Sequence, residues 1–322
     1  MSTFVVDRRK IASVKEHPNA DRLDICQVEG LSYSFITGRG EYTIGDEAIY
    51  FPIDSVLPDS LVERLGIKHN RIRTMKLRGS ISQGLVVRPD KVTEEELNAV
   101  TKYEAVEMIV RYQGGTPRPA EVTYYDLENW ERYPNPLARL MDKEVWVTEK
   151  LEGTNYYCFV GIDGRVIVGG RNTSAPEGDN TFWNVTRKFG IAERAKELSQ
   201  QYNADVVLRG ELVGPGIQKN IYKLTAPCVY LFDLSLNGTF VPCREWYDEL
   251  RELPIVPILA RDVELGPWLA GQTLGERSNG YSALADTYRE GIVVKPTEEE
   301  WDEEIGRLVL KARSPMYLAN ER

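Results

Sequence analysis

Histidine and cysteine are scarce in this chain of 322 residues, which has two histidines and four cysteines. The cysteines are scattered and form no CxxC pair, so neither His17 nor His69 has a cysteine cluster with which to bind zinc. The same scatter argues against a disulfide framework. No apolar run approaches the roughly 20 residues that span a bilayer, and residues 1–10 lack the apolar core of a secretory signal. We therefore expect a cytoplasmic or otherwise intracellular protein with no membrane partner.

Hydrophobic residues make up 42% of the chain and charged residues 28%, a balance that excludes a disordered protein. The formal net charge of −9 argues mildly against a nucleic-acid partner, but the charge is distributed unevenly. Between Arg64 and Pro89 the chain has seven basic residues and no acidic one. Such a stretch is typical either of a solvated loop and strand face or of a groove that follows a phosphate backbone.

Residues 1–112 contain short candidate strands separated by turns. The clearest are Asp24–Val28, Tyr33–Thr37, Ala48–Phe51 and Gly84–Val87. Glu94–Val110 has a helical pattern with Thr93 as its N-cap. Many short strands with Gly and Pro between them predict a small β-barrel. Residues 113–120 contain two glycines and two prolines, and we interpret them as a linker between domains.

Residues 121–322 have longer strand-like runs mixed with helical stretches at Thr181–Tyr202 and Arg244–Glu252. The strand-like runs are Glu144–Thr148, Tyr156–Ile162, Val166–Val168, Val206–Arg209, Val229–Leu234 and Gly291–Lys295. Their irregular alternation with helices predicts an α+β domain with a largely antiparallel sheet rather than repeated βαβ units.

The segment from Glu149 to Asn155 reads EKLEGTN, and its lysine ends an apolar strand. A lysine amine is a nucleophile only when it is deprotonated, and a glycine three residues later lets a phosphate approach the backbone closely. A KxxG pattern alone is weak, and this segment taken by itself is as typical of an ordinary strand end followed by a turn as of a reactive lysine. Further segments follow in order: VGGRN at Val168–Asn172, RGELVGPGIQ at Arg209–Gln218, LFD at Leu231–Asp233, REGIVVKP at Arg289–Pro296 and LKARS at Leu310–Ser314.

Taken together, these ordered segments resemble the motifs of the covalent nucleotidyltransferase superfamily, which contains polynucleotide ligases and mRNA capping enzymes. The EKxxGTN and GELxGPGxQ forms are most similar to the RNA ligase 2-like branch. The resemblance covers residues 121–322 and implies an ATP-grasp-like nucleotidyltransferase domain of antiparallel sheets with helices. The last motif departs from the branch, because Arg313 stands where a second lysine is common.

The resemblance implies that Lys150 attacks the α-phosphorus of ATP to form lysyl-AMP, that AMP passes to a 5′-phosphate, and that a 3′-hydroxyl then attacks. The residues it implies for ATP and AMP binding are Glu149, Leu151, Asn155, Arg171, Glu211, Phe232, Lys295, Lys311 and Arg313. Glu290 and Glu211 are the carboxylates implied for Mg²⁺ or Mn²⁺. Phe232 is expected to stack on the adenine. Each of these residues taken singly is equally typical of a core or surface position.

The first domain resembles the N-terminal OB-fold of Deinococcus/Naegleria-type RNA ligases, through the strings HPNADRL at His17–Leu23, YFPIDSVLP at Tyr50–Pro58 and KLRGSISQGL at Lys76–Leu85. The implied partner is RNA, as a nick in an RNA or RNA/DNA duplex, bound by a monomer. The residues we expect to contact it are Arg71, Arg73, Lys76 and Arg78. Few residues follow Arg313, so we expect no OB-fold after the catalytic domain. The alternatives are a DNA ligase, a GTP-dependent capping-type enzyme and a non-catalytic RNA-binding homologue.

Overall fold

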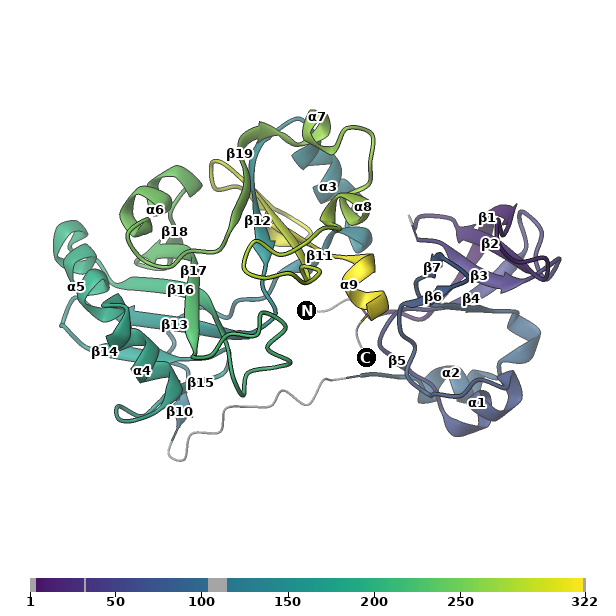
Figure 1. Cartoon of the computed structure of the whole chain (residues 1–322), viewed down its shortest axis with the longest axis horizontal. Coiled ribbons are helices and arrows are strands. Elements are labelled where there is room, and N and C mark those ends of the chain that lie inside the picture. Colours follow the sequence, from purple (N-terminus) through teal and green to yellow (C-terminus); the bar gives the residue numbers. More distant parts are fainter. Residues whose placement is uncertain (1–3, 32, 104–114, 321–322) are drawn as a thin grey trace. The chain divides into compact units, whose positions relative to one another are not determined.

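The computed structural model describes residues 4–31, 33–103 and 115–320. Its internal contacts divide the chain into two units (Figure 1). Unit 1 comprises residues 1–106 and 315–322, and unit 2 comprises residues 107–314. Within the described ranges, no helix is both long and apolar enough to cross a membrane.

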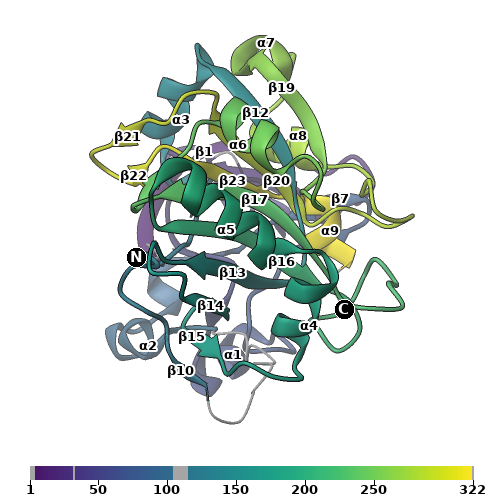
Figure 2. The same ribbon diagram turned by 90° about the vertical axis from the view of Figure 1, so that its left-hand side faces the viewer.

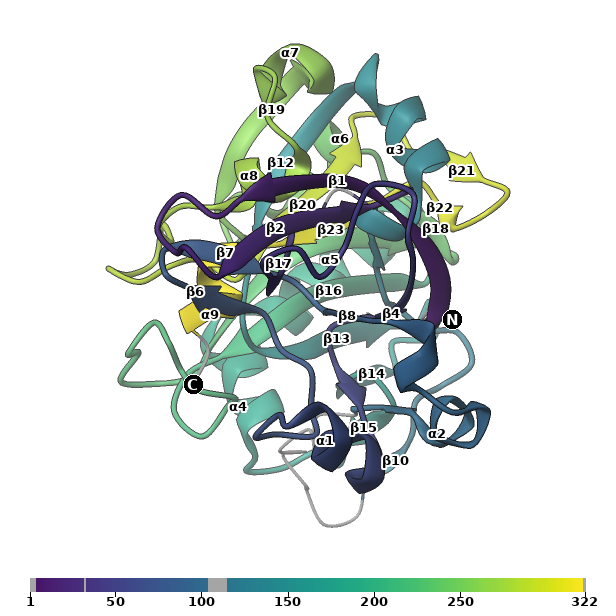
Figure 3. The same ribbon diagram turned by 90° about the vertical axis from the view of Figure 1, so that its right-hand side faces the viewer.

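Unit 1 is built on a five-stranded antiparallel sheet in the order β3-β2-β1-β4-β8, which curls into an OB-type barrel (Figure 3). Its strands are β1 (Asp7–Glu16), β2 (Leu23–Val28), β3 (Phe35–Gly38), β4 (Glu47–Phe51) and β8 (Leu85–Val87). Strand β1 pairs with β4 through Asp7–Lys10 and with β2 from Ile11 onward, and a bulge between Ile11 and Ser13 interrupts the pairing with β2. Apolar side chains on both faces of the sheet are buried in two clusters, so the predicted OB-fold is confirmed.

The remaining elements of unit 1 surround this barrel. They are β5 (Ser55–Val56), α1 (Asp59–Leu65), β6 (Met75–Leu77), β7 (Ser80–Ser82), the 3₁₀ helix Pro89–Lys91, α2 (Glu94–Ala99), β9 (Thr101–Lys102) and α9 (Pro315–Asn320). Helix α2 begins after the N-cap Thr93, as the sequence predicts, and Thr93 forms a capping box with Glu96. The helix ends much earlier than expected. Val100 is extended, and Thr101–Lys102 pair with β5, because consecutive β-branched residues favour strand geometry. Residues 104–110 of the predicted helix lie outside the described residues.

Unit 2 contains two main sheets with helices packed against them. The larger sheet has seven strands in the order β10-β15-β14-β13-β16-β17-β18, and the smaller has five in the order β11-β23-β20-β12-β19. All described strand pairs in these sheets are antiparallel except β11 with β23. The predicted α+β architecture with largely antiparallel sheets is therefore confirmed.

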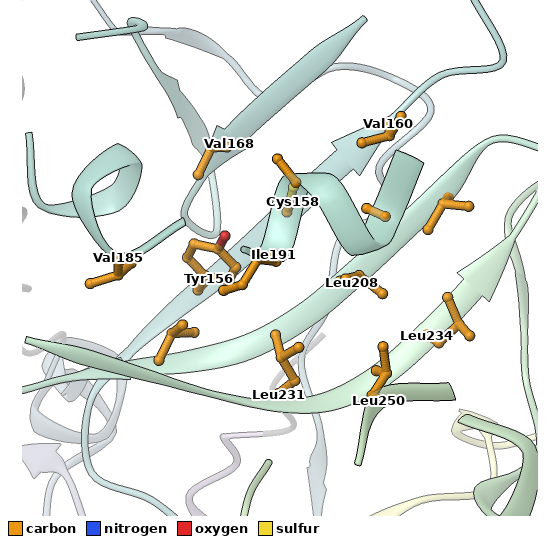
Figure 4. Packing of buried hydrophobic residues seen from close by; sticks show 14 of the residues in the cluster. Tyr156, Cys158, Val160, Val168, Val185, Ile191, Leu208, Leu231, Leu234 and Leu250 are labelled. Atoms are coloured by element: carbon orange, nitrogen blue, oxygen red, sulfur yellow. The ribbon is translucent and has the colours of Figure 1, made fainter. Parts of the chain in front are cut away.

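The strands of the larger sheet are β10 (Thr116–Pro117), β13 (Thr154–Val160), β14 (Val166–Gly169), β15 (Thr173–Ala175), β16 (Val206–Val213), β17 (Cys228–Leu236) and β18 (Thr239–Phe240). The helices that accompany it are α4 (Thr181–Lys188), α5 (Ile191–Tyr202) and α6 (Cys243–Leu250). Helix α5 lies along one face of β13 and β16 (Figure 2). Between the sheet and the helices α5 and α6 lies the largest core of the described residues, which includes Tyr156, Cys158, Leu208, Ile191 and Leu250 (Figure 4).

The strands of the smaller sheet are β11 (Glu128–Asn129), β12 (Glu144–Lys150), β19 (Ile258–Glu264), β20 (Gly291–Pro296) and β23 (Leu310–Arg313). The 3₁₀ helix Trp130–Arg132 and the helices α3 (Pro134–Met141), α7 (Leu265–Leu269) and α8 (Leu274–Ser278) enclose the second core of unit 2 with it. A short hairpin, β21 (Trp301–Asp302) and β22 (Gly306–Arg307), joins β20 to β23.

The division into units differs from the predicted domain boundaries at two places. Thr116–Pro117, expected within the linker 113–120, form strand β10 and pair with β15. Helix α9, expected within the domain 121–322, groups with unit 1. Neither element has a local pattern that reveals its partner, because both are short and gain their structure from the surface against which they pack.

Candidate active site

Lys150 is the last residue of β12, the fourth strand of the smaller sheet. The register of that sheet pairs Lys150 with Gly291 of β20, and Gly291 in turn with Arg313 of β23. Three segments that are far apart in the sequence therefore end side by side. The Lys150 amine donates a hydrogen bond to Oε2 of Glu290 at 2.6 Å, and its side chain is 24% exposed. The other carboxylate oxygen of Glu290 lies 3.5 Å from Nε of Arg313.

The turn after Lys150 packs closely against the end of β16. A Cβ atom on Gly153 would lie 2.4 Å from the carbonyl oxygen of Leu212 and 2.8 Å from side-chain atoms of Glu211 and Val213. No side chain fits there without a backbone shift. The glycine of the KxxG pattern therefore serves the close approach of two chain segments, whereas from the sequence we expected it to admit a phosphate.

A pocket opens beside Lys150, between the ends of the two sheets of unit 2. Nine of the sequence-predicted site residues line it: Glu149, Lys150, Leu151, Asn155, Arg171, Glu211, Phe232, Lys295 and Lys311. Asn155 and Glu211 face each other across paired strands β13 and β16. Glu290 and Arg313 do not line the pocket. Glu290 adjoins it through the ion pair with Lys150, and Arg313 lies beside Glu290. The pocket is thus open, part polar and rich in cations.

Glu149 lines the pocket, but its carboxylate is hydrogen-bonded to a neighbouring loop. Successive residues of a strand point to opposite faces, so Glu149 lies on the face of Val145 and Val147, and Lys150 lies on the other. Oε2 of Glu149 accepts a hydrogen bond from the Ala283 backbone at 2.8 Å, while Oε1 is buried and has no hydrogen-bond partner among the described residues. Burial raises the pKa of this carboxyl group, against the opposing effects of Ser282, Ala283 and Arg289.

Glu152, two residues after Lys150, is connected to the loop between β16 and β17. Its backbone N–H donates to the Tyr222 hydroxyl at 2.6 Å, and its Oε1 accepts from the Lys219 backbone at 3.4 Å. Burial raises the pKa of the Glu152 carboxyl, and the nearby charge of Glu290 raises it further. The loop residues Gln218, Asn220 and Lys223 all have positive φ angles, a backbone conformation that costs free energy in residues other than glycine. The loop is therefore held in a strained shape against the Lys150 turn.

Lys295 is buried and its amine is already engaged within the protein. It donates to the carbonyl oxygen of Phe232 at 2.6 Å and to Oδ1 of Asp233 at 2.8 Å. Arg307 pairs with both oxygens of Asp233, and the Tyr125 hydroxyl donates to Oδ2 at 2.6 Å. Burial alone would raise the pKa of Asp233, but the charges of Arg307 and Lys295 outweigh it and hold that pKa well below its usual range. Arg307 and Tyr125 are not in any motif that the sequence analysis recognised.

Phe232 forms part of the pocket wall, with its ring half-buried. Its ring centroid lies 5.3 Å from that of Tyr125. The Lys295 amine lies 5.6 Å from the Phe232 ring centroid, in addition to its hydrogen bond to the Phe232 carbonyl. Phe232 is therefore held in place by Lys295 and Tyr125, which both bind the buried Asp233.

The residues Tyr125, Asp126 and Leu127 line the pocket although sequence reasoning missed them. They precede β11, which pairs in parallel with β23 and places Asn129 opposite Lys311. Oδ1 of Asp126 accepts a hydrogen bond from Lys311 at 3.3 Å, and Oδ2 lies 3.8 Å from Arg171. Burial would raise the pKa of Asp126, but the charges of Lys311 and Arg171 prevail and lower it. The only sequence signal for this segment is an acid and two aromatics before the first helix of the domain.

Comparisons with known proteins identify the family and support the fold. A family model described as RNA ligase matches residues 143–313, and an OB-fold domain model matches residues 5–89. The chain belongs to the RNA ligase family. The segments around Lys150, Glu211, Glu290 and Lys311 all lie within the part that the RNA ligase model matches.

Solved structures of an RNA ligase from Naegleria gruberi are similar to the whole chain. The structure with pyrophosphate is 25% identical, with a TM-score of 0.76, and covers 99% of this chain and 98% of that one. A variant with ATP and Mn is 24% identical, with a TM-score of 0.78 and 99% of each chain covered. Among curated proteins, the phenylalanine–tRNA ligase β subunit of Halalkalibacterium halodurans is 26% identical over 164 residues, which is 45% of this chain and 19% of that protein.

In this RNA ligase family member, the basic residues predicted to contact RNA lie in unit 1 near the hairpin β6–β7. Arg71 is occupied, since it pairs with Asp54 at 2.6 Å and lies over the Tyr103 ring at 3.6 Å. Arg73, Lys76 and Arg78 are exposed. Arg78 is at the hairpin turn with φ of 49°, and Asn19 donates to its carbonyl oxygen at 3.2 Å. The hairpin thus presents a basic surface on a braced turn.

Proposed function

We propose that this chain is an ATP-dependent RNA ligase that joins a 3′-hydroxyl to a 5′-phosphate through lysyl-AMP and a 5′-adenylylated strand. The observation that carries the proposal is the Lys150 amine at the edge of a cation-lined pocket, 2.6 Å from Glu290. In the first step the amine nitrogen bonds to the α-phosphorus, and the bond from that phosphorus to pyrophosphate breaks. Oε2 of Glu290 is placed to accept the amine proton.

The pocket has groups suited to each part of ATP. Phe232 offers an aromatic face for the adenine, and Asn155 and Glu211 offer polar groups for the ribose. Lys311 and Arg171 supply positive charge for the phosphates. Arg313 does not line the pocket and lies next to Glu290. Lys295 supports the same wall through Phe232 and Asp233. That structures similar to the whole chain hold ATP and Mn, or pyrophosphate, supports this assignment.

A divalent metal fits this site only as a partner of the nucleotide. Within the described ranges, no group of three or more His, Cys, Asp or Glu side chains is placed to hold a metal ion. Glu290 and Glu211 are single carboxylates, which suits Mg²⁺ or Mn²⁺ bound by one or two carboxylates together with substrate phosphates and water. When bound, the metal would neutralise charge on the phosphates.

We propose that unit 1 holds the RNA ends at a nick. The exposed Arg73, Lys76 and Arg78 carry this part of the proposal, because cations on and next to a braced hairpin can follow a phosphate backbone without reading the bases. Replacing these three residues by alanine should leave Lys150 adenylylation intact and weaken the sealing of a nicked RNA duplex.

Mass spectrometry of the purified chain after incubation with ATP and Mn²⁺ or Mg²⁺ tests the central step. We expect one added AMP on the wild type and none on Lys150→Ala. Replacing ATP by GTP in the same assay distinguishes a ligase from a capping-type enzyme. A wild-type chain that gains no adenylate, or a Lys150→Ala variant that still does, would contradict the proposal.

A further inference from the structure

Asp126 occupies the space between two cations that the proposed function assigns to phosphate binding. Its carboxylate uses one oxygen for Lys311, at 3.3 Å, and the other for Arg171, at 3.8 Å. All three side chains line the pocket beside Lys150. A carboxylate that bridges two cations in this way has the charge and the oxygen spacing with which a phosphate group would bridge them.

The backbone holds Asp126 in this place. Strand β11 follows directly and is bonded to β23 beside Lys311. On the other side, the buried Tyr125 hydroxyl donates to Asp233 at 2.6 Å. The Asp126 carboxylate also accepts a hydrogen bond from the Leu127 backbone at 2.9 Å. The segment is therefore fixed at both ends, while the Asp126 side chain itself is 42% exposed.

We propose that Asp126 is an internal competitor of the nucleotide: its carboxylate occupies a phosphate subsite between Lys311 and Arg171, and an incoming triphosphate displaces it. This inference rests on the proposed function, because it takes the pocket to be the ATP site. Asp126 thereby lowers the affinity for phosphate-bearing ligands, and it keeps the two cations in position when no nucleotide is bound.

The physical consequence is specific to phosphate. Removing the charge of Asp126 leaves Lys311 and Arg171 with more uncompensated positive charge, which attracts a triphosphate more strongly and leaves an uncharged nucleoside unaffected. Because the ion pairs are partly exposed, each is weak. We expect Asp126→Asn to lower the dissociation constant for ATP by roughly threefold to tenfold, the range that two such pairs support.

Isothermal titration calorimetry measures this effect when the covalent step is removed by Lys150→Ala. ATP and adenosine are each titrated into Lys150→Ala and into Lys150→Ala/Asp126→Asn. The second variant should bind ATP more tightly and adenosine equally. Asp163→Asn is the matched control, since Asp163 is an exposed aspartate paired with Arg165 in unit 2 and does not line the pocket.

A kinetic measurement complements the binding data. With Lys150 intact, Asp126→Asn should lower the KM for ATP in the adenylylation step without lowering its kcat. Unchanged or weaker ATP binding, an equal change for adenosine, or a fall in kcat would each overturn the inference, the last by making Asp126 a participant in the chemistry. A wild-type chain that never becomes adenylylated refutes the proposed function instead, and this inference with it.

Discussion

Replacing Lys295 by methionine tests whether this lysine acts through the protein or contacts the nucleotide. In the structure its side chain is 2% exposed, and its amine donates to Asp233 and to the Phe232 carbonyl. Methionine retains the length of the side chain and removes the charge. The substitution leaves Asp233 buried with one cation fewer, although Arg307 and Tyr125 still contact it.

The expected loss of stability is large for a single substitution. Removing one partner of a buried ion pair costs about 3–5 kcal/mol, because the remaining charge is left without compensation. Because Arg307 and Tyr125 still contact Asp233, we expect the loss of stability in Lys295→Met to lie at the lower end of this range, about 3 kcal/mol. Lys143→Met is the matched control, since Lys143 pairs with Glu300 at a similarly short distance, 2.6 Å, but is 39% exposed. That pair should contribute only about 0.2–1 kcal/mol.

Urea unfolding gives the free energy of unfolding of both variants, and a double-mutant cycle with Asp233→Asn isolates the pair. We expect the double variant to be more stable than additivity predicts by about 1–2 kcal/mol, because it loses the Lys295–Asp233 interaction once, whereas the sum of the two single variants counts that loss twice. The KM for ATP should rise, since the Phe232 wall loses its support. The reasoning is refuted if Lys295→Met is as stable as Lys143→Met while adenylylation is lost, which is the behaviour of a direct phosphate contact.

Two further substitutions test the segments on either side of Lys150. Burial raises the pKa of Glu149 above its unfolded value, so this residue reduces stability increasingly as the pH rises through that raised pKa. Glu149→Gln should therefore have a higher Tm than the wild type at pH 7 and no advantage near pH 4. Equal Tm differences at both pH values would contradict this. Tyr222→Phe removes the acceptor of the buried Glu152 N–H and should cost about 1–3 kcal/mol in urea unfolding. Tyr42→Phe, which removes a buried hydroxyl without a hydrogen-bond partner among the described residues, should cost much less.

Local patterns in the chain were sufficient to predict the barrel and the antiparallel strands, and the resemblance of its ordered segments to family motifs implied nine of the residues that line the pocket beside Lys150. Each depends on neighbours in sequence: alternating burial identifies strands, and a motif identifies the chemistry of its own few residues. The RNA ligase family match covers the same segments. The predicted roles of the individual site residues remain predictions.

Tertiary structure decided which side chains are already bound within the protein and which are left for a ligand. From the sequence, Lys295 and Lys311 both look like strand cations. Both line the pocket, yet the Lys295 amine is buried against Asp233, whereas Lys311 is partly exposed beside Asp126. Asp126, Tyr125 and Arg307 belong to no motif, and they reach the site through a strand pairing and side-chain hydrogen bonds between residues more than 60 positions apart. The interaction between two charges depends on their distance in space. For residues far apart in the chain, that distance is set by how the strands pair, and local sequence does not reveal it.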